Sequence, residues 1–209
     1  MLFRSLTLSL ALALSAVGLS GCGGGGNDEV AVLETKYGRI VYEFMPDVAP
    51  KHVARFKEMI RDGDFDGTKF HRVIKGKIIQ GGDPNSKDDD PLNDGLGDSP
   101  YPDLPGEFSD IPFDKGIVGA ARQGPRPAFG GMPELTKAQA YDTANCQFYI
   151  TLTRVARWDG EYAVFGKVIE GLNNAQVIAG APTRPGTENP EVKIVMKSVT
   201  LQPRASFAR

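Results

Sequence analysis

The stretch Phe70–Asp83 reads FHRVIKGKIIQGGD and places a guanidinium, that of Arg72, and an amide, that of Gln80, inside an otherwise β-prone apolar run. The apolar members of the run favour β-strands: Phe70, Val73, Ile74, Ile78 and Ile79. Gly76-Lys77 predicts a break between two short strands, and Gly81-Gly82 predicts the end of the second. Such a strand buries at least one face, where a guanidinium is unfavourable unless it is paired or used. Arg72 is therefore either half of a structural ion pair or a functional group.

The rest of the chain predicts many short strands and few helices. Strands are expected at 30–35, 39–44, 70–74, 77–80, 116–121, 147–152, 164–169 and 192–201. Apolar residues spaced by four, three and four from Ala49 to Ile60 predict a helix that ends at Asp62-Gly63, and a second helix is expected at 172–178. This pattern indicates an antiparallel barrel or a sandwich, and composition alone does not separate the two.

The N-terminus has the features of an export signal. Met1–Ser20 carries one cation, Arg4, followed by a Leu- and Ala-rich run that is too short to span a bilayer. The following Leu19-Ser20-Gly21-Cys22 resembles the bacterial lipobox, in which the cysteine becomes the lipidated first residue after cleavage. We therefore expect a cleaved signal at 1–21 and a lipidated Cys22 that opens a glycine-rich tether at 22–29. Acyl chains would hold the protein on a membrane surface of the cell envelope, lipid-anchored and facing the periplasm.

The remaining chain suits one domain at 30–202, followed by a short tail at 203–209. The whole chain of 209 residues has a formal net charge of −2, which is no footprint of nucleic-acid binding. Residues 123–143, called the insertion below, form a long connection that opens with Gly124-Pro125. A monomer is the default expectation.

No pattern predicts a metal or another cofactor. The acidic run Asp88–Asp90 fails as an EF-hand, because the third and twelfth positions of the loop would be Leu92 and Tyr101. With Cys22 lipidated, Cys146 has no cysteine left to pair with, and neither histidine of the chain is near it in sequence. We expect Cys146 to pack as a small apolar side chain.

The opening stretch, as FHRVI-x-G-x-x-x-QGGD, resembles the cyclophilin family of peptidyl-prolyl isomerases. Three later motifs follow in the order of that family: GIVGAAR at 116–122, QFYI at 147–150 and VFGKV at 164–168. The resemblance runs from about Val30 to about Leu201. It implies a mainly β fold, a closed eight-stranded antiparallel barrel capped by two helices.

The resemblance also implies a site. Arg72 would donate a hydrogen bond that favours the twisted prolyl amide, and Gln80 would orient Arg72 while contacting the substrate backbone. Substrate-binding or supporting roles fall on Phe70, His71, Ile78, Ala121, Gln147, Tyr149, Trp158 and Tyr162. On the residues alone, core packing is the preferred explanation for Ile78 and Tyr149. Such a reaction needs no metal and no general base, because the rotation barrier of roughly 20 kcal/mol comes from amide resonance.

Several positions depart from the family pattern. Lys77 stands where a pocket-lining Phe is usual, and Arg157 where many members have Trp. Trp158 then takes the place of a Leu, unless a shift of one residue returns it to the usual Trp position. Gly119 and Ala120 replace a larger Ser-Met pair.

The leading hypothesis is a peptidyl-prolyl cis/trans isomerase that assists the folding of exported proteins and takes proline-containing polypeptides as substrates. Lys77 and the Arg157-Trp158 pair keep an alternative open, a catalytically weak proline-peptide binding module. A third hypothesis is an envelope chaperone or scaffold that binds partners through the insertion.

Overall fold

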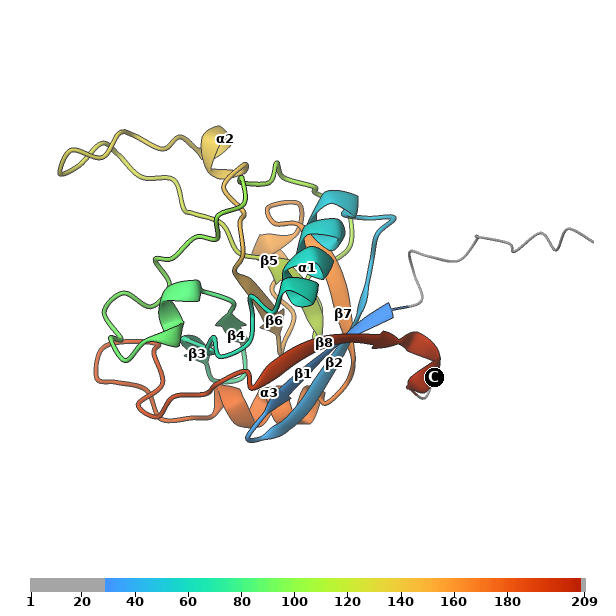
Figure 1. Ribbon diagram of the computed structural model, residues 1–209. Coiled ribbons are helices and arrows are strands. Elements are labelled where there is room, and N and C mark those ends of the chain that lie inside the picture. Colours follow the sequence, from blue (N-terminus) through green and yellow to red (C-terminus); the bar gives the residue numbers. More distant parts are fainter. Residues whose placement is uncertain (1–28, 208–209) are drawn as a thin grey trace, which may run out of the picture.

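The computed structural model describes residues 29–207 (Figure 1), so the predicted signal and Cys22 lie outside the described residues. The strands are β1 (Glu29–Thr35), β2 (Gly38–Phe44), β3 (Arg72–Ile74), β4 (Ile78–Gly81), β5 (Ile117–Ala120), β6 (Phe148–Thr151), β7 (Val164–Glu170) and β8 (Ser198–Pro203). The helices are α1 (Pro50–Asp62), α2 (Lys137–Ala140) and α3 (Leu172–Ala179), with 3₁₀ turns at Pro84–Lys87, Ala156–Trp158 and Arg204–Ser206. Within 29–207, no helix is long and apolar enough to cross a membrane.

The eight strands form one antiparallel sheet in the order β3-β4-β6-β5-β7-β2-β1-β8. The sheet curls, and α1 and α3 lie at its two ends, α1 against β7 and β8 and α3 against β2, β3 and β4 (Figure 1). The expectation of a mainly β, antiparallel fold of eight strands with a helix at each end is confirmed. The third helix, α2, lies in the insertion.

The expected closure of the barrel is not shown by the strand pairing. β3 and β8 are the two edges of the sheet, and no ladder joins them in the described part of the chain. The two edges meet only through the segments before them, where the Phe70 N–H donates to the Ile194 carbonyl at 2.9 Å. The reason lies in β3 itself, since its Val73 N–H donates to the Glu188 carbonyl at 2.7 Å. The connection between α3 and β8 therefore occupies the edge that closure by β8 would need, and the fold is an open half-barrel.

The main core lies inside the curl of the sheet and is rich in aromatic rings. Phe56 of α1 stacks on Phe165 of β7 with ring centroids 4.2 Å apart, and on Phe65 at 5.7 Å. Phe148 of β6 meets Phe56 edge-on at 6.1 Å. This packing explains the apolar spacing of the predicted helix, whose C-terminus is set by Gly63 at a φ of 76° in the left-handed region.

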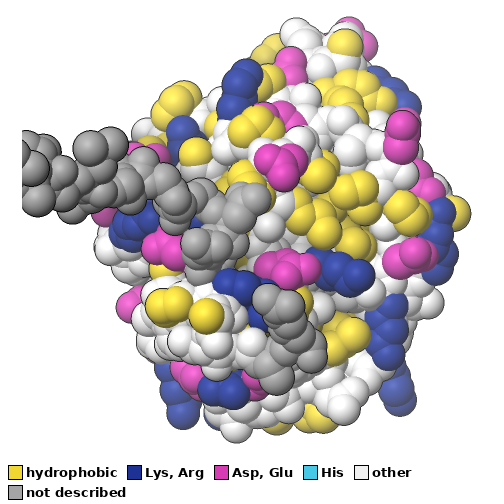
Figure 2. All heavy atoms as spheres, turned by 90° about the vertical axis from the view of Figure 1, so that its right-hand side faces the viewer, with side chains coloured by type: hydrophobic (Ala, Val, Ile, Leu, Met, Phe, Trp, Pro, Cys, Tyr) yellow, Lys and Arg dark blue, Asp and Glu magenta, His cyan; other side chains and the backbone are white. Residues whose placement is uncertain are grey.

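The surface carries no large field of one sign on the face seen in Figure 2. Acidic and basic side chains are interspersed there around a central group of apolar ones. This agrees with the small net charge of the chain.

The N-terminus of α1 is capped from a distant loop. The residue before the helix is Ala49, which offers no side-chain acceptor. Instead, the Glu107 carboxylate accepts hydrogen bonds from the backbone N–H groups of Lys51 (3.1 Å) and His52 (3.0 Å), and from Nδ1 of His52 (2.7 Å). An anion at this position satisfies free N–H groups and interacts favourably with the helix dipole. Glu107 thus ties the loop before β5 to the helix that covers the core.

Protonation of this contact should make the protein sensitive to acid. Burial alone would raise the pKa of Glu107, but the hydrogen bonds from His52 and the backbone lower it overall from 4.5. Burial lowers the pKa of His52 from 6.5 despite the nearby carboxylate. Both groups therefore bind fewer protons in the folded state, so their stabilisation is present at neutral pH and is lost as the pH falls.

We expect Glu107→Gln to unfold about 1 kcal/mol more easily at neutral pH, because a charged helix cap is lost. The difference from wild type should narrow as the pH falls through the lowered pKa of Glu107, because the wild-type carboxylate then also takes up a proton. Thermal unfolding followed by circular dichroism at several pH values measures this. Glu134→Gln, which removes an exposed carboxylate in the insertion, is the control. A constant difference across the pH range would contradict the assignment.

Candidate active site

Four residues on neighbouring strands stand opposite one another across the sheet. They are Arg72 on β3, Gln80 on β4, Tyr149 on β6 and Gly119 on β5. Their neighbours in sequence, Val73, Ile79, Ile150 and Val118, form the adjacent row and lie in the core. Because successive side chains of a strand point to opposite faces, the first row lies on the outer face of the sheet. A cation, an amide and a phenol are thus brought into one line.

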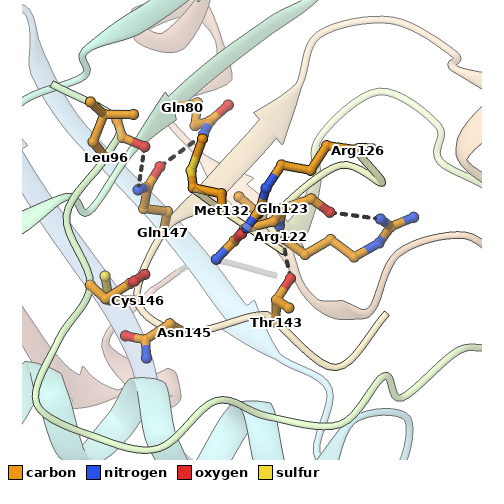
Figure 3. Close-up of a pocket in the computed structure, with 13 residues that line it drawn as sticks. Gln80, Leu96, Arg122, Gln123, Arg126, Met132, Thr143, Asn145, Cys146 and Gln147 are labelled. Atoms are coloured by element: carbon orange, nitrogen blue, oxygen red, sulfur yellow. Dashed lines mark hydrogen bonds between the residues drawn. The ribbon is translucent and has the colours of Figure 1, made fainter. Parts of the chain in front are cut away.

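A chain of hydrogen bonds connects the polar members of this face. Nη1 of Arg72 donates to Oε1 of Gln80 at 3.2 Å, and Nε2 of Gln80 donates to Oε1 of Gln147 at 3.0 Å. The amide of Gln147 donates in turn to the carbonyls of Gly95 (3.0 Å) and Gly97 (3.2 Å), and Figure 3 shows the contact between the two glutamines. Each amide therefore has a defined orientation. The Arg72 side chain keeps 41% of its surface exposed, so it faces solvent as well as this chain.

Arg72 also has a partner that was absent from the sequence analysis. Its Nε donates to Oε2 of Glu188 at 2.5 Å. Glu188 lies in the long connection between α3 and β8, far from Arg72 in sequence. The sequence analysis left Arg72 as either half of an ion pair or a functional group. The structure is compatible with both, because Arg72 is paired with Glu188 and is still partly exposed.

The remaining outer face of β5 and β6 carries an aromatic group, the outer aromatic cluster, made of Phe113, Tyr149, Trp158 and Tyr162. The Tyr149 ring lies 4.8 Å from Trp158 and 5.8 Å from Tyr162, measured between centroids. These two rings cover Tyr149, which is only 3% exposed. Burial raises the pKa of Tyr149 well above its usual value, so its phenol stays neutral.

The Tyr149 ring can occupy this position only because residue 119 is a glycine. A β-carbon at position 119 would lie 2.6 Å from the Tyr149 hydroxyl, which is closer than atoms can approach. The absence of a side chain on β5 therefore makes room for the larger ring on β6. Gly119, which stands where the family pattern has a larger residue, thus leaves the space that the Tyr149 ring fills.

A cavity of about 450 Å³ opens beside the two glutamines (Figure 3). Its wall contains Gln80 of β4, Ala121 just after β5 and Gln147 just before β6. The insertion contributes Arg126 and Met132. Leu96 lies at the same end of the cavity as Met132 and the glutamines. The Ala121 N–H donates to the Gln147 carbonyl at 2.9 Å, which holds these two lining residues together.

Only the base of the insertion is tied firmly to the body. Arg122 lies between the rings of Tyr141 and Tyr162, with Cζ 4.8 and 4.4 Å from their centroids. Glu161 accepts hydrogen bonds from Lys137 (2.8 Å) and from the hydroxyl of Tyr141 (3.0 Å). The tip is a small hairpin whose Phe129 is 77% exposed.

The structure separates the predicted site residues into three groups. Arg72, Gln80, Gln147 and Ala121 meet at the open part of the outer face. Tyr149, Trp158 and Tyr162 form most of the outer aromatic cluster. The third group, Phe70, His71 and Ile78, is buried: Phe70 belongs to the main core, and Ile78 is fully covered.

Three departures can now be placed. Trp158 packs in the outer aromatic cluster, while Arg157 before it is exposed. Lys77 is half-buried in the turn between β3 and β4, where its N–H donates to the Ile74 carbonyl at 2.9 Å.

Cys146 lies at the cavity but is unsuited to act as a nucleophile, because burial raises the pKa of its thiol to about 12. No group of three or more His, Cys, Asp or Glu side chains within 29–207 could hold a metal ion.

The sequence analysis missed Glu188, Leu96 and Met132. All three come from connections between strands, and no local pattern distinguishes them from other loop residues. The length of the insertion was the one signal that a loop could border this face.

Comparisons with known proteins agree with this geometry. Residues 30–201 match the family described as cyclophilin type peptidyl-prolyl cis-trans isomerase/CLD. A protein of Brucella abortus (strain 2308) named probable peptidyl-prolyl cis-trans isomerase is 36% identical over 178 residues, which cover 82% of this chain and 83% of that protein. Peptidyl-prolyl cis-trans isomerase-like 1 of Bos taurus is 35% identical over 150 residues, covering 67% of this chain and 73% of the relative.

A solved structure is also similar. The cyclophilin-type isomerase of Cryptosporidium parvum, crystallised in the presence of the dipeptide Ala-Pro, matches with a TM-score of 0.66 and 26% identity. The match covers 83% of this chain and 98% of that one. On the family match across residues 30–201 and the relatives above 30% identity, the chain belongs to the cyclophilin family of peptidyl-prolyl cis-trans isomerases.

Proposed function

We propose that the protein catalyses the cis/trans isomerisation of X–Pro peptide bonds, with Arg72 as the group that acts on the prolyl amide. The observation that carries the proposal is the placement of Arg72. Its guanidinium is held by Gln80 on the adjacent strand and is open to solvent, on the face that also holds a cavity and an apolar cluster.

Isomerisation of an X–Pro bond requires little more than a hydrogen-bond donor placed as Arg72 is. Resonance gives the X–Pro amide a rotation barrier of roughly 20 kcal/mol. A donor aimed at the prolyl nitrogen binds the twisted amide, whose lone pair is localised, better than either planar form. Arg72 is suited to this because its N–H donors are rigid and always protonated.

The two sides of Gln80 offer places for the two parts of a substrate. We place the proline against the outer aromatic cluster and the preceding chain along the cavity at Ala121 and Gln147. The solved relative from Cryptosporidium parvum was crystallised with Ala-Pro, and this supports a proline-containing ligand. Because Trp158 and Tyr162 cover Tyr149, a proline that reaches Tyr149 has to displace one of these rings.

The same cover favours a second candidate function, a proline-peptide binding module with weak catalysis. Tyr149 and Ile78 are both buried, so neither offers a ready wall to a proline ring. Binding without turnover would follow if the displaced rings closed around the proline away from Arg72.

Removing the donor separates the two functions. We expect Arg72→Ala to reduce kcat/KM about 10²-fold or more, which is of order 3 kcal/mol, because one transition-state hydrogen bond is lost. NMR exchange spectroscopy of a short Ala-Pro peptide measures the reaction without a coupled assay. Arg39→Ala is a matched control, since Arg39 is also half-exposed and also bonded through Nε to a glutamate, Glu170, at 2.5 Å. Undiminished exchange with Arg72→Ala would exclude Arg72 as the acting group.

Trp158 provides a direct report on where the proline binds, because it is the only tryptophan of the chain. Titration with an Ala-Pro peptide should change its fluorescence in a saturable way, since displacement of either Trp158 or Tyr162 changes the ring contacts of Trp158. An Ala-Ala peptide of the same length is the control. Catalysed exchange with unchanged tryptophan emission would show that the proline binds away from the outer aromatic cluster.

We also propose that the protein acts on exported polypeptides from the membrane surface of the cell envelope. The support is the predicted signal and the lipobox-like Leu19-Ser20-Gly21-Cys22. Cys22→Ser should move the protein from the membrane fraction to the soluble fraction of a bacterial host, because the acylated thiol is absent. Mass spectrometry of the N-terminal peptide identifies the lipid directly. Unchanged membrane association of the variant would rule out this anchor.

A further inference from the structure

We infer that Glu188 is a positioning residue, whose carboxylate holds the guanidinium of Arg72 so that its remaining donors face the prolyl amide. The inference rests on the proposed function and names a part of its machinery. It starts from a hydrogen bond between two residues that are far apart in the sequence. Nε of Arg72 donates to Oε2 of Glu188 at 2.5 Å.

The two contacts of Arg72 together fix a plane. A guanidinium is flat and sits on a long, flexible stem, so a single hydrogen bond leaves it free to swing. Gln80 accepts from Nη1 and Glu188 accepts from Nε, which are different nitrogens of the same plane. Nη2 has no hydrogen-bond partner in the part of the chain that the structure describes. Nη2, together with the second N–H of Nη1, is therefore left to donate to a ligand.

The carboxylate does not mask Arg72. A carboxylate that neutralises an arginine most strongly takes a two-pronged geometry, as Asp159 does with two nitrogens of Arg154. Glu188 takes Nε alone. This contact orients the guanidinium of Arg72 and leaves its other donors free to bind a ligand, so Glu188 does not block Arg72.

The position of Glu188 is set by its backbone, independently of its side chain. The Glu188 carbonyl accepts from the Val73 N–H at 2.7 Å, directly after Arg72 in β3. The turn before it is closed by the Thr187 N–H to the Arg184 carbonyl at 3.0 Å, with Gly186 at a φ of 73°. The side chain of Asn189 after it donates to Asp94 at 2.8 Å. Changing the carboxylate therefore leaves these anchors in place.

The test compares Glu188→Ala and Glu188→Gln with a matched ion pair elsewhere. We expect kcat to fall about 10-fold in the alanine variant, with KM within about 2-fold, because a misplaced donor weakens the transition state more than ground-state binding. The glutamine variant, which still carries an acceptor oxygen, should lose less. Glu170→Gln is the control, since it breaks the equivalent contact with Arg39.

Two further readouts distinguish positioning from a general loss of stability. The Nε–H cross-peak of Arg72 in a ¹H–¹⁵N spectrum, assigned by its loss in Arg72→Lys, should shift toward the position of a free arginine in Glu188→Ala. In an Arg72→Ala background, Glu188→Ala should change kcat no further, because the two residues act as one unit.

Each outcome bears on the inference. Unchanged or increased kcat in Glu188→Ala, with wild-type turnover intact, would overturn the inference alone. Additive losses in the double variant would overturn it as well, since Glu188 would then act without Arg72. A wild-type protein without turnover would overturn the proposed function, and the cross-peak would still report whether the contact exists.

Discussion

The register between β3, β4, β6 and β5 is the constraint on which the site depends. One row across these strands enters the core, and the next row faces outward. Because the side-chain period of a strand is two residues, a slip of one position would bury the guanidinium of Arg72 and expose the apolar row. The burial of Val73, Ile79, Ile150 and Val118 thus fixes the placement of the polar face. The energy that folds the sheet also assembles the site.

Two kinds of contact hold the side chains of the outer face: hydrogen bonds at one end and packing of aromatic rings at the other. From β3 and β4 to the residue before β6, hydrogen bonds between Arg72, Gln80 and Gln147 fix the orientations of these side chains. At β5 and β6, aromatic rings pack to fill a fixed space. A smaller side chain on one strand can be offset there by a larger side chain on the next. The pairing of a glycine on β5 with a tyrosine on β6 is such a case. The departures Gly119 and Trp158 lie at the apolar end, whereas Lys77 lies in the turn between β3 and β4, beside strands that keep Arg72 and Gln80.

Much of the sheet and the polar core of the site could be predicted from the sequence. Arg72 and Gln80 lie in one hairpin, and local pattern together with family resemblance was enough to bring them together. Glu188 could not be found in this way, since nothing local separates it from Glu191 in the same connection. Core packing of Ile78 and Tyr149 was the preferred explanation on the residues alone, but the open edge between β3 and β8 and the cover of Tyr149 by Trp158 and Tyr162 escaped prediction. They depend on what packs against a strand from elsewhere in the chain, and a motif does not contain that information.

The insertion is attached to the body through its base, where Arg122 lies between two tyrosine rings and Glu161 accepts from both Lys137 and Tyr141. Its tip, which carries the exposed Phe129 and the cavity-lining Met132, contributes little to the folded core. Substitutions at the tip therefore alter the rim of the cavity without disturbing the strands below. Under the proposed function, sequence changes at the tip would alter which polypeptides meet this rim and leave Arg72 and Gln80 in place. The choice of polypeptide and the proposed chemistry would then depend on different segments of the chain.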